Sequence, residues 1–141
     1  MQPDPARMAE TREWFAKAAL DLRAAEFEFT AVPPLTADIA FHAQQLAEKV
    51  LKGFLTWHDQ PFRKTHNLVE IGQQCVAIDA TLEDLARRAA RLTEYAWKFR
   101  YPGEPDEPSV AEAQEALARV RKRDVSFGPR TREGAKAWDT S

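Results

Sequence analysis

The chain has 141 residues, of which 44% are hydrophobic and 30% charged, a composition typical of one globular domain and not of a disordered or collagen-like chain. Its 20 Lys and Arg against 22 Asp and Glu give a formal net charge of -2, so any contact with nucleic acid or an anionic membrane must come from a local patch. Cys75 is the only cysteine, which excludes an internal disulfide. Neither a secretory signal nor a membrane span is evident, so we expect a cytoplasmic protein with no membrane contact.

The first two predicted helices are marked by apolar residues at helical spacing. A helix over residues 11–29 carries Trp14 and Phe15, and the proline pair that follows it removes backbone donors and ends it. A second helix is predicted over residues 36–57. Its apolar residues recur at steps of three and four, which predicts one buried face made of Ile39, Ala43, Leu46, Val50, Phe54 and Trp57.

Polar residues recur on the second helix with the same rhythm and predict a separate strip. His42, Gln45, Lys49 and Lys52 are expected to share this strip. Lysine supplies a positive charge for phosphate, and histidine or glutamine can hydrogen-bond a base or a ribose, so the strip indicates nucleotide binding. The alternative is an ordinary solvated face, on which Glu48 and Lys52 form an i,i+4 ion pair.

A third helix is predicted over residues 68–78, and the residues just before it are a second candidate site. Lys64 and His66 stand at the start of this helix, where unpaired N–H groups and the positive end of the helix dipole favour an anion such as phosphate. The alternative is that Thr65 or Asn67 simply caps the helix and His66 packs against its neighbours.

Two more helices complete the predicted fold. Thr81 is the expected N-cap of a fourth helix, and Ser109 with Glu112 reads as the capping box of a fifth. No segment alternates with a period of two, so strands are not expected. The chain therefore reads as an all-α, up-and-down antiparallel bundle of four to five helices over residues 10–125, followed by a polar tail, residues 126–141, that we expect to be mobile.

Three separated motifs carry a family resemblance. They are FHAQQLAEKVLK at residues 41–52, KTHNL at residues 64–68 and FRYPG at residues 99–103. In this order they resemble the HEPN domain of higher eukaryotes and prokaryotes, a nucleotide-binding family, over roughly residues 10 to 125. The resemblance implies a helical bundle that is usually a homodimer. It also implies a minimal nucleotidyltransferase as partner, encoded beside it in a toxin-antitoxin-like system.

Some members of that family are ribonucleases with an arginine followed four to six residues later by a histidine. Here only two residues separate Arg63 from His66, and no histidine follows Arg100. If the arginine holds the scissile phosphate and the histidine moves the proton, this chain lacks the pair at the proper spacing. We therefore expect a protein that is not an enzyme alone, and we assign no catalytic residue.

The end of the fourth helix adds two candidate residues. Arg100 is expected to project there, close to the loop before the third helix, so that Arg100 and this loop could clamp one ligand. The alternative is that Arg100 only complements the helix dipole. The resemblance points to Tyr101 as an acceptor of a nucleotidyl group from the partner transferase. No two histidines have i,i+4 spacing and no Gly-rich phosphate loop is present, so neither a metal nor a cofactor is expected.

Three hypotheses of function follow. The first is a HEPN-type homodimer that binds a nucleotide or RNA and acts with a nucleotidyltransferase. The second is a divergent ribonuclease that uses His66 with Arg63 or Arg100. The third is a purely structural homo-oligomer whose helix faces only mediate assembly.

Overall fold

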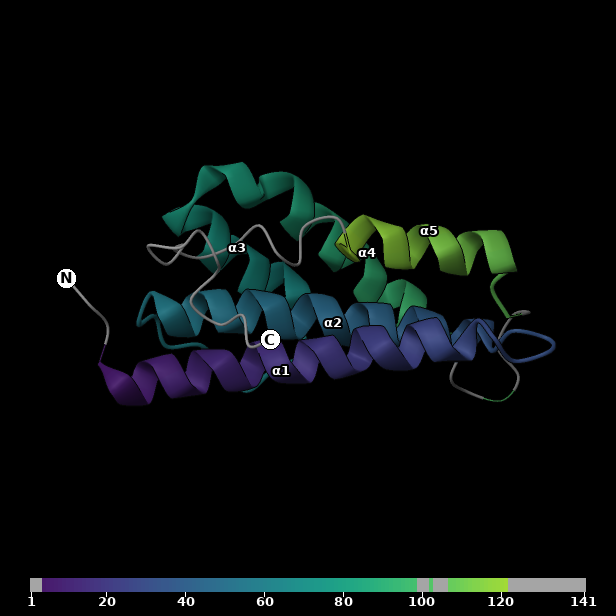
Figure 1. Ribbon diagram of the computed structural model, residues 1–141. Coiled ribbons are helices and arrows are strands. Elements are labelled where there is room, and N and C mark those ends of the chain that lie inside the picture. Colours follow the sequence, from purple (N-terminus) through teal and green to yellow (C-terminus); the bar gives the residue numbers. More distant parts are fainter. Residues whose placement is uncertain (1–3, 99–101, 103–106, 122–141) are drawn as a thin grey trace.

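The computed structural model describes residues 4–98, 102 and 107–121 (Figure 1). In chain order its elements are the helices and one 3-10 turn that follow: α1 (Pro5–Glu28), α2 (Thr36–Trp57), α3 (Leu68–Ile78), η1 (Ala80–Leu82), α4 (Glu83–Lys98) and α5 (Val110–Arg121). No strand occurs among these described residues, and the predicted all-α helical bundle is confirmed. The expected tail, residues 126–141, lies outside the described residues.

Two predicted helix starts are confirmed by their hydrogen bonds. The side chain of Asn67 accepts from the backbone N–H groups of Val69 and Glu70, at 3.0 and 3.4 Å. The N–H of Ser109 donates to Oε1 of Glu112 at 3.0 Å, and the N–H of Glu112 donates to the Ser109 hydroxyl at 3.1 Å. These bonds satisfy donors that a helix start would otherwise leave unpaired, so α3 and α5 begin where the sequence predicts.

Two other helix starts differ from the prediction. Helix α1 begins at Pro5 and not at residue 11, because Asp4 accepts from the N–H of Arg7 at 2.9 Å and a proline suits the first helical position. The predicted cap Thr81 is wrong. Asp79 takes that role for the η1 turn that leads into α4, accepting both the N–H and the hydroxyl of Thr81.

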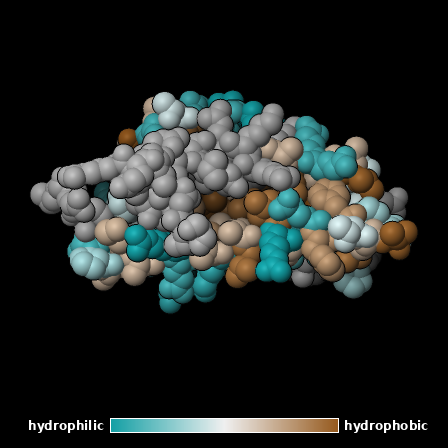
Figure 2. All heavy atoms as spheres, in the orientation of Figure 1, coloured by the Kyte–Doolittle hydropathy of each residue, from teal (hydrophilic) through white to brown (hydrophobic). Residues whose placement is uncertain are grey.

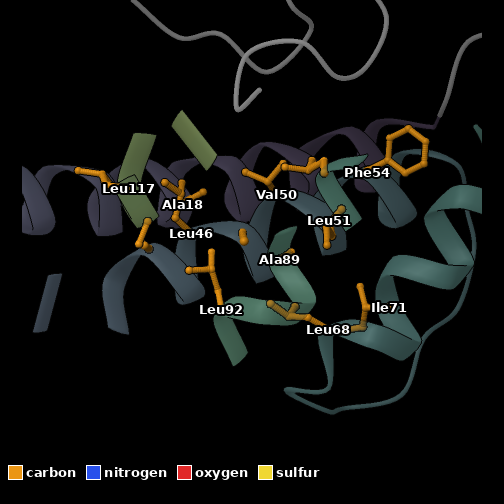
Figure 3. Close-up of a cluster of buried hydrophobic side chains, with 14 of the residues drawn as sticks. Ala18, Leu46, Val50, Leu51, Phe54, Leu68, Ile71, Ala89, Leu92 and Leu117 are labelled. Atoms are coloured by element: carbon orange, nitrogen blue, oxygen red, sulfur yellow. The ribbon is translucent and has the colours of Figure 1, made fainter. Parts of the chain in front are cut away.

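Helix α2 is the centre of the bundle. It lies beside α1 along its length and also contacts α3, α4 and α5 (Figure 1). The predicted apolar face of α2 is buried from Ile39 to Phe54, with Trp57 half-buried at its end. Figure 3 shows side chains from every α-helix meeting in this core, among them Ala18, Leu46, Ile71, Ala89 and Leu117.

Helices α1 and α2 approach each other closely at Gly53. A Cβ atom at this position would lie 2.6 Å from Cε2 of Phe15 and 3.2 Å from Cβ of Trp14. No side chain larger than hydrogen fits there without displacing the Phe15 ring. Gly53 therefore sets the spacing that also places Trp14 beside the end of α2.

Hydrophilic and hydrophobic side chains are interspersed on the face shown in Figure 2. Exposed apolar side chains include Leu20 and Phe27 on α1 and Val32 in the turn that follows. Of the helices in the described part of the chain, none combines the length and the apolar character that crossing a membrane requires.

Candidate functional site

A groove of about 980 Å³ is lined by the first turns of α1, the last turns of α2 and the loop before α3. Three of the predicted nucleotide-binding residues, Lys52, Lys64 and His66, line it. They come from two separate candidate sites in the sequence, the polar strip and the start of α3. The groove walls also include Arg7, Trp14 and Phe62.

The carboxylate of Glu48 contacts two residues of the groove, His66 and Lys52. Its side chain is only 4% exposed, yet it lies 2.9 and 3.1 Å from Nδ1 of His66 and accepts from Nζ of Lys52 at 3.2 Å. The amide of Gln44 donates to it at 3.4 Å. An ionised carboxylate can only accept, so Nδ1 of His66 is the donor in this contact. A buried charge with several donors thus fixes a histidine whose side chain is 65% exposed.

Lys52 is buried between this carboxylate and two aromatic rings. Its side chain is 8% exposed, and Nζ lies 5.6 Å from the ring centroid of Trp14 and 5.8 Å from that of Phe62. The two rings meet edge to face, with centroids 6.1 Å apart. Glu48 and the rings together compensate the ammonium charge. Lys52 contributes a charge to the groove wall and is not the exposed side chain that the sequence predicts.

The other members of the predicted strip lie around the helix from Lys52. Lys49 forms an ion pair with Asp21 of α1, and Nδ1 of His42 lies 3.1 Å from the other oxygen of Asp21. Nε2 of His42 is 3.6 Å from Oε1 of Glu28. This cluster lies in the contact between α1 and α2.

The prediction of one shared exposed strip is therefore wrong, and the helix geometry gives the reason. Between His42 and Lys52 the strip advances by steps of three, four and three residues. At about 100° per residue, the ten residues from His42 to Lys52 end about 80° short of three full turns, so these two side chains point in directions about 80° apart. Lys52 is buried because Trp14 and Phe62 cover it. His42 and Lys49 lie on the side of α2 that faces α1, where Asp21 pairs with both. The role of these four residues in binding stays a prediction.

Pairing and burial shift the pKa values in the α1–α2 cluster. Burial raises the pKa of the Asp21 carboxyl, but hydrogen bonds from His42 and Lys49 outweigh it, so the net shift is downward. The hydrogen bond to Asp21 raises the pKa of His42 against an opposing effect of burial, with Glu28 adding to the increase. Burial raises the pKa of Glu28 itself. The cluster is thus a set of mutually compensating charges that links two helices.

The remaining predicted residues are placed as follows. Gln45 is half-buried and donates to the side-chain oxygen of Gln44 at 2.8 Å. Arg100 and Tyr101 lie outside the described residues. Arg63, the proposed partner of His66 in a ribonuclease, turns to Glu70 and forms two hydrogen bonds of 3.0 Å with its carboxylate. Arg63 is absent from the groove lining.

Four residues were not singled out by the sequence patterns: three that line the groove and Glu48, which contacts two lining residues. Glu48 reads as half of a surface ion pair, and Trp14 and Phe62 read as core. Arg7 lies in the part of α1 that was not predicted. Only the Asp4–Pro5 start of that helix could have signalled its presence, since an acidic cap before proline is a common helix start.

Neither a metal site nor a reactive thiol is apparent in the described part of the chain. No group of three or more His, Cys, Asp or Glu side chains is arranged there to hold a metal ion. Burial raises the pKa of the Cys75 thiol to about 12, which keeps it protonated and unreactive.

Comparison with known proteins gives one finding. The family model of the HEPN domain matches residues 11–122, which is most of the chain and includes every described helix except the first turns of α1. Neither the curated proteins nor the solved structures give a significant match.

Proposed function

We propose that this chain, which belongs to the HEPN domain family, binds the phosphate-bearing part of a nucleotide or of RNA in the groove between α1, α2 and the loop before α3. Family membership supports a nucleotide- or RNA-related module. The proposal adds the location of the ligand and the residues that contact it.

The single observation that carries the proposal is the gathering of Lys64, His66, Trp14 and Phe62 in one groove. Cations supply charge for a phosphate, and the imidazole supplies a directional hydrogen bond. Aromatic side chains beside a basic groove suit the bases of single-stranded nucleic acid, at about 1–3 kcal/mol per stacked base. Both parts of a nucleotide therefore have partners of the right chemistry within one site.

Isothermal titration of the purified protein with AMP, ATP and a short single-stranded RNA tests this proposal. We expect Lys64→Ala and His66→Ala to weaken binding of the ligand that the wild type binds. Arg87→Ala is the matched control, because Arg87 is an exposed cation on α4 that pairs with Glu83 at 3.0 Å and is absent from the groove lining. Absence of binding by the folded wild type, or equal loss in all three variants, would contradict the proposal.

We also propose that the chain acts in the cytoplasm as a homodimer with a minimal nucleotidyltransferase partner, in a toxin-antitoxin-like system. The family resemblance supports this assembly. Light scattering measures the dimer, and co-expression with a transferase encoded next to this gene measures the complex. A dimer that elutes with its partner but binds no nucleotide would favour a purely structural role.

The Glu48–His66 contact favours a second candidate function, a divergent ribonuclease. A histidine oriented by a carboxylate is a common arrangement for general acid–base catalysis. The described residues offer Arg7 as the groove arginine, since Arg63 is engaged with Glu70. Incubation with RNA decides between the two functions: cleavage that is lost in His66→Ala supports an enzyme, and no cleavage, or cleavage unchanged in His66→Ala, excludes this candidate.

A further inference from the structure

Arg7 stands in the groove with part of its hydrogen-bonding capacity unused. Its Nε is buried and has no hydrogen-bond partner among the described residues, although its side chain as a whole is 25% exposed. A buried donor without an acceptor costs free energy, and native proteins rarely leave one without a reason. An acceptor in the groove would satisfy it once the partly exposed Arg7 side chain turns its Nε toward that acceptor.

Within the described part of the chain, the guanidinium pairs with the carboxylate of Asp59, and this pair is weak. Nη1 of Arg7 lies 3.4 Å from Oδ2 of Asp59, whose side chain is 80% exposed. Asp59 follows the end of α2 and has a φ of 55°, in the left-handed region. A single long contact to an exposed carboxylate contributes little to stability, because water competes for both partners.

Two other charges of the groove, Lys52 and Asp4, are more firmly engaged. Lys52 forms an ion pair with Glu48 at 3.2 Å, and both side chains are almost fully buried. Separating them would leave an unpaired charge in the protein interior. Asp4 accepts the N–H of Arg7 at the start of α1. Among the ion pairs of the described groove residues, the pair of Arg7 with Asp59 is therefore the easiest to open.

We propose that Arg7 is the principal phosphate-binding residue of the groove and that Asp59 competes with the phosphate for its guanidinium. The inference rests on the proposed function and names the residue that anchors the ligand. A guanidinium presents Nε and one Nη as a fork that matches two phosphate oxygens. The unused Nε shares its edge of the guanidinium with Nη2, so a phosphate on that edge would pair Nε, while Asp59 on Nη1 competes for the positive charge and not for the same N–H groups.

Three variants test the competition: Arg7→Gln, Asp59→Asn and the double variant. Asparagine tolerates the left-handed backbone as well as aspartate does, so Asp59→Asn removes the charge alone. The probes are AMP and a short single-stranded RNA, titrated separately at low salt, and they distinguish a free nucleotide from a polymer as the source of the phosphate.

We expect Arg7→Gln to weaken binding about tenfold or more, as for loss of a hydrogen bond between charged groups. Asp59→Asn should tighten binding severalfold, and the double variant should match Arg7→Gln alone. Arg7→Lys keeps the charge without the fork, so it should bind better than Arg7→Gln and worse than the wild type. If Arg7→Gln does not fold, Arg7→Lys takes its place as the test variant. Arg87→Gln, on α4, is the matched control and should bind as the wild type does.

The outcomes separate this inference from the proposed function. Binding by the wild type that is unchanged in both single variants would overturn the role of Arg7 and leave the groove as the site. Tighter binding of the double variant than of Arg7→Gln would show that Asp59 repels the ligand directly, which would overturn the competition. Absence of binding by the wild type would overturn both.

Discussion

Removal of the Glu48 side chain should lower the free energy of unfolding strongly. In Glu48→Ala the ammonium group of Lys52, whose side chain is 8% exposed, loses its carboxylate and becomes an unpaired charge inside the protein. Such losses cost about 3–5 kcal/mol of the free energy of unfolding. Urea denaturation followed by circular dichroism measures the change.

Glu83→Ala is the matched control for Glu48→Ala. It also breaks an i,i+4 pair of a carboxylate with a cation, Arg87, but both of these side chains are more than half exposed. Its cost should be about 0.5 kcal/mol or less. Equal costs in the two variants would show that Glu48 does not compensate a buried charge.

The pKa values of His42 and His58 should lie on opposite sides of the ordinary histidine value. The hydrogen bond to Asp21 raises the pKa of His42 above its reference value of 6.5, whereas burial lowers that of His58 below the same value, with nearby Arg7 adding to the decrease. NMR titration of the ring protons measures both values in one sample. Asp21→Asn should lower the pKa of His42 and leave that of His58 unchanged.

This titration has a consequence for stability. The folded pKa of His42 is the higher one, so its contribution to the free energy of unfolding is fully present below the unfolded value, near 6.5, and is lost as pH rises through the folded value. The stability difference between the wild type and His42→Gln should therefore shrink as pH rises above about 6.5. A difference that grows over this range would contradict the assigned pairing.

At the residue level, the sequence singled out two residues that line the candidate groove, and their role in binding stays a prediction. Lys64 and His66 were found because a helix start is a local signal, and a helix start exposes groups that can bind an anion. Arg7 and Glu48 were not found, because their importance depends on which residues other helices bring beside them. A glutamate four residues before a lysine looks the same on a surface as in an interior.

At the level of elements, Gly53 offers the sharpest test. Gly53→Ala should destabilise the protein by about 1–2 kcal/mol, although alanine is the better helix former, because its Cβ would lie 2.6 Å from the buried Phe15 ring. Thermal and urea unfolding measure the effect. Gln73→Ala, at an exposed position of α3, is the control and should change stability by no more than about 0.5 kcal/mol. A more stable Gly53→Ala would show that α1 and α2 can move apart at little cost.

The helix bounds were predicted best where caps and periodicity agree. Both signals coincide at α3, which Asn67 caps. At α2 the position N-terminal to the helix, Leu35, makes no side-chain cap, and the preceding proline pair marks the start instead. The two helices were found at residues 68–78 and 36–57 as expected. The start of α1 was missed because its first turns carry few bulky apolar residues, and the cap of α4 was misplaced because Asp79 and Thr81 both have capping side chains. The polar strip failed for a different reason, since a pattern of steps does not say which neighbour covers each side of a helix.

For the whole molecule, the charge balance limits how strongly salt should affect RNA binding. A formal net charge of -2 gives no long-range attraction for RNA, so RNA binding at the proposed site would depend on a few local cations, chiefly Arg7 and Lys64. Each phosphate neutralised on a single strand contributes a slope of about −0.7 to the plot of log K against log salt concentration. We expect a total slope between about −1 and −2, measured by fluorescence anisotropy. A slope steeper than about −4 would indicate an extended basic surface instead of this groove.

The groove shares its rim with the start of α1, because Asp4 and Ala6 are part of its lining. Anything fused ahead of these residues would emerge at the mouth of the cavity. A purification tag at that end would compete with a ligand for space, and a histidine-rich tag would add imidazoles of its own. Affinity measurements should therefore use protein from which such an extension has been cleaved.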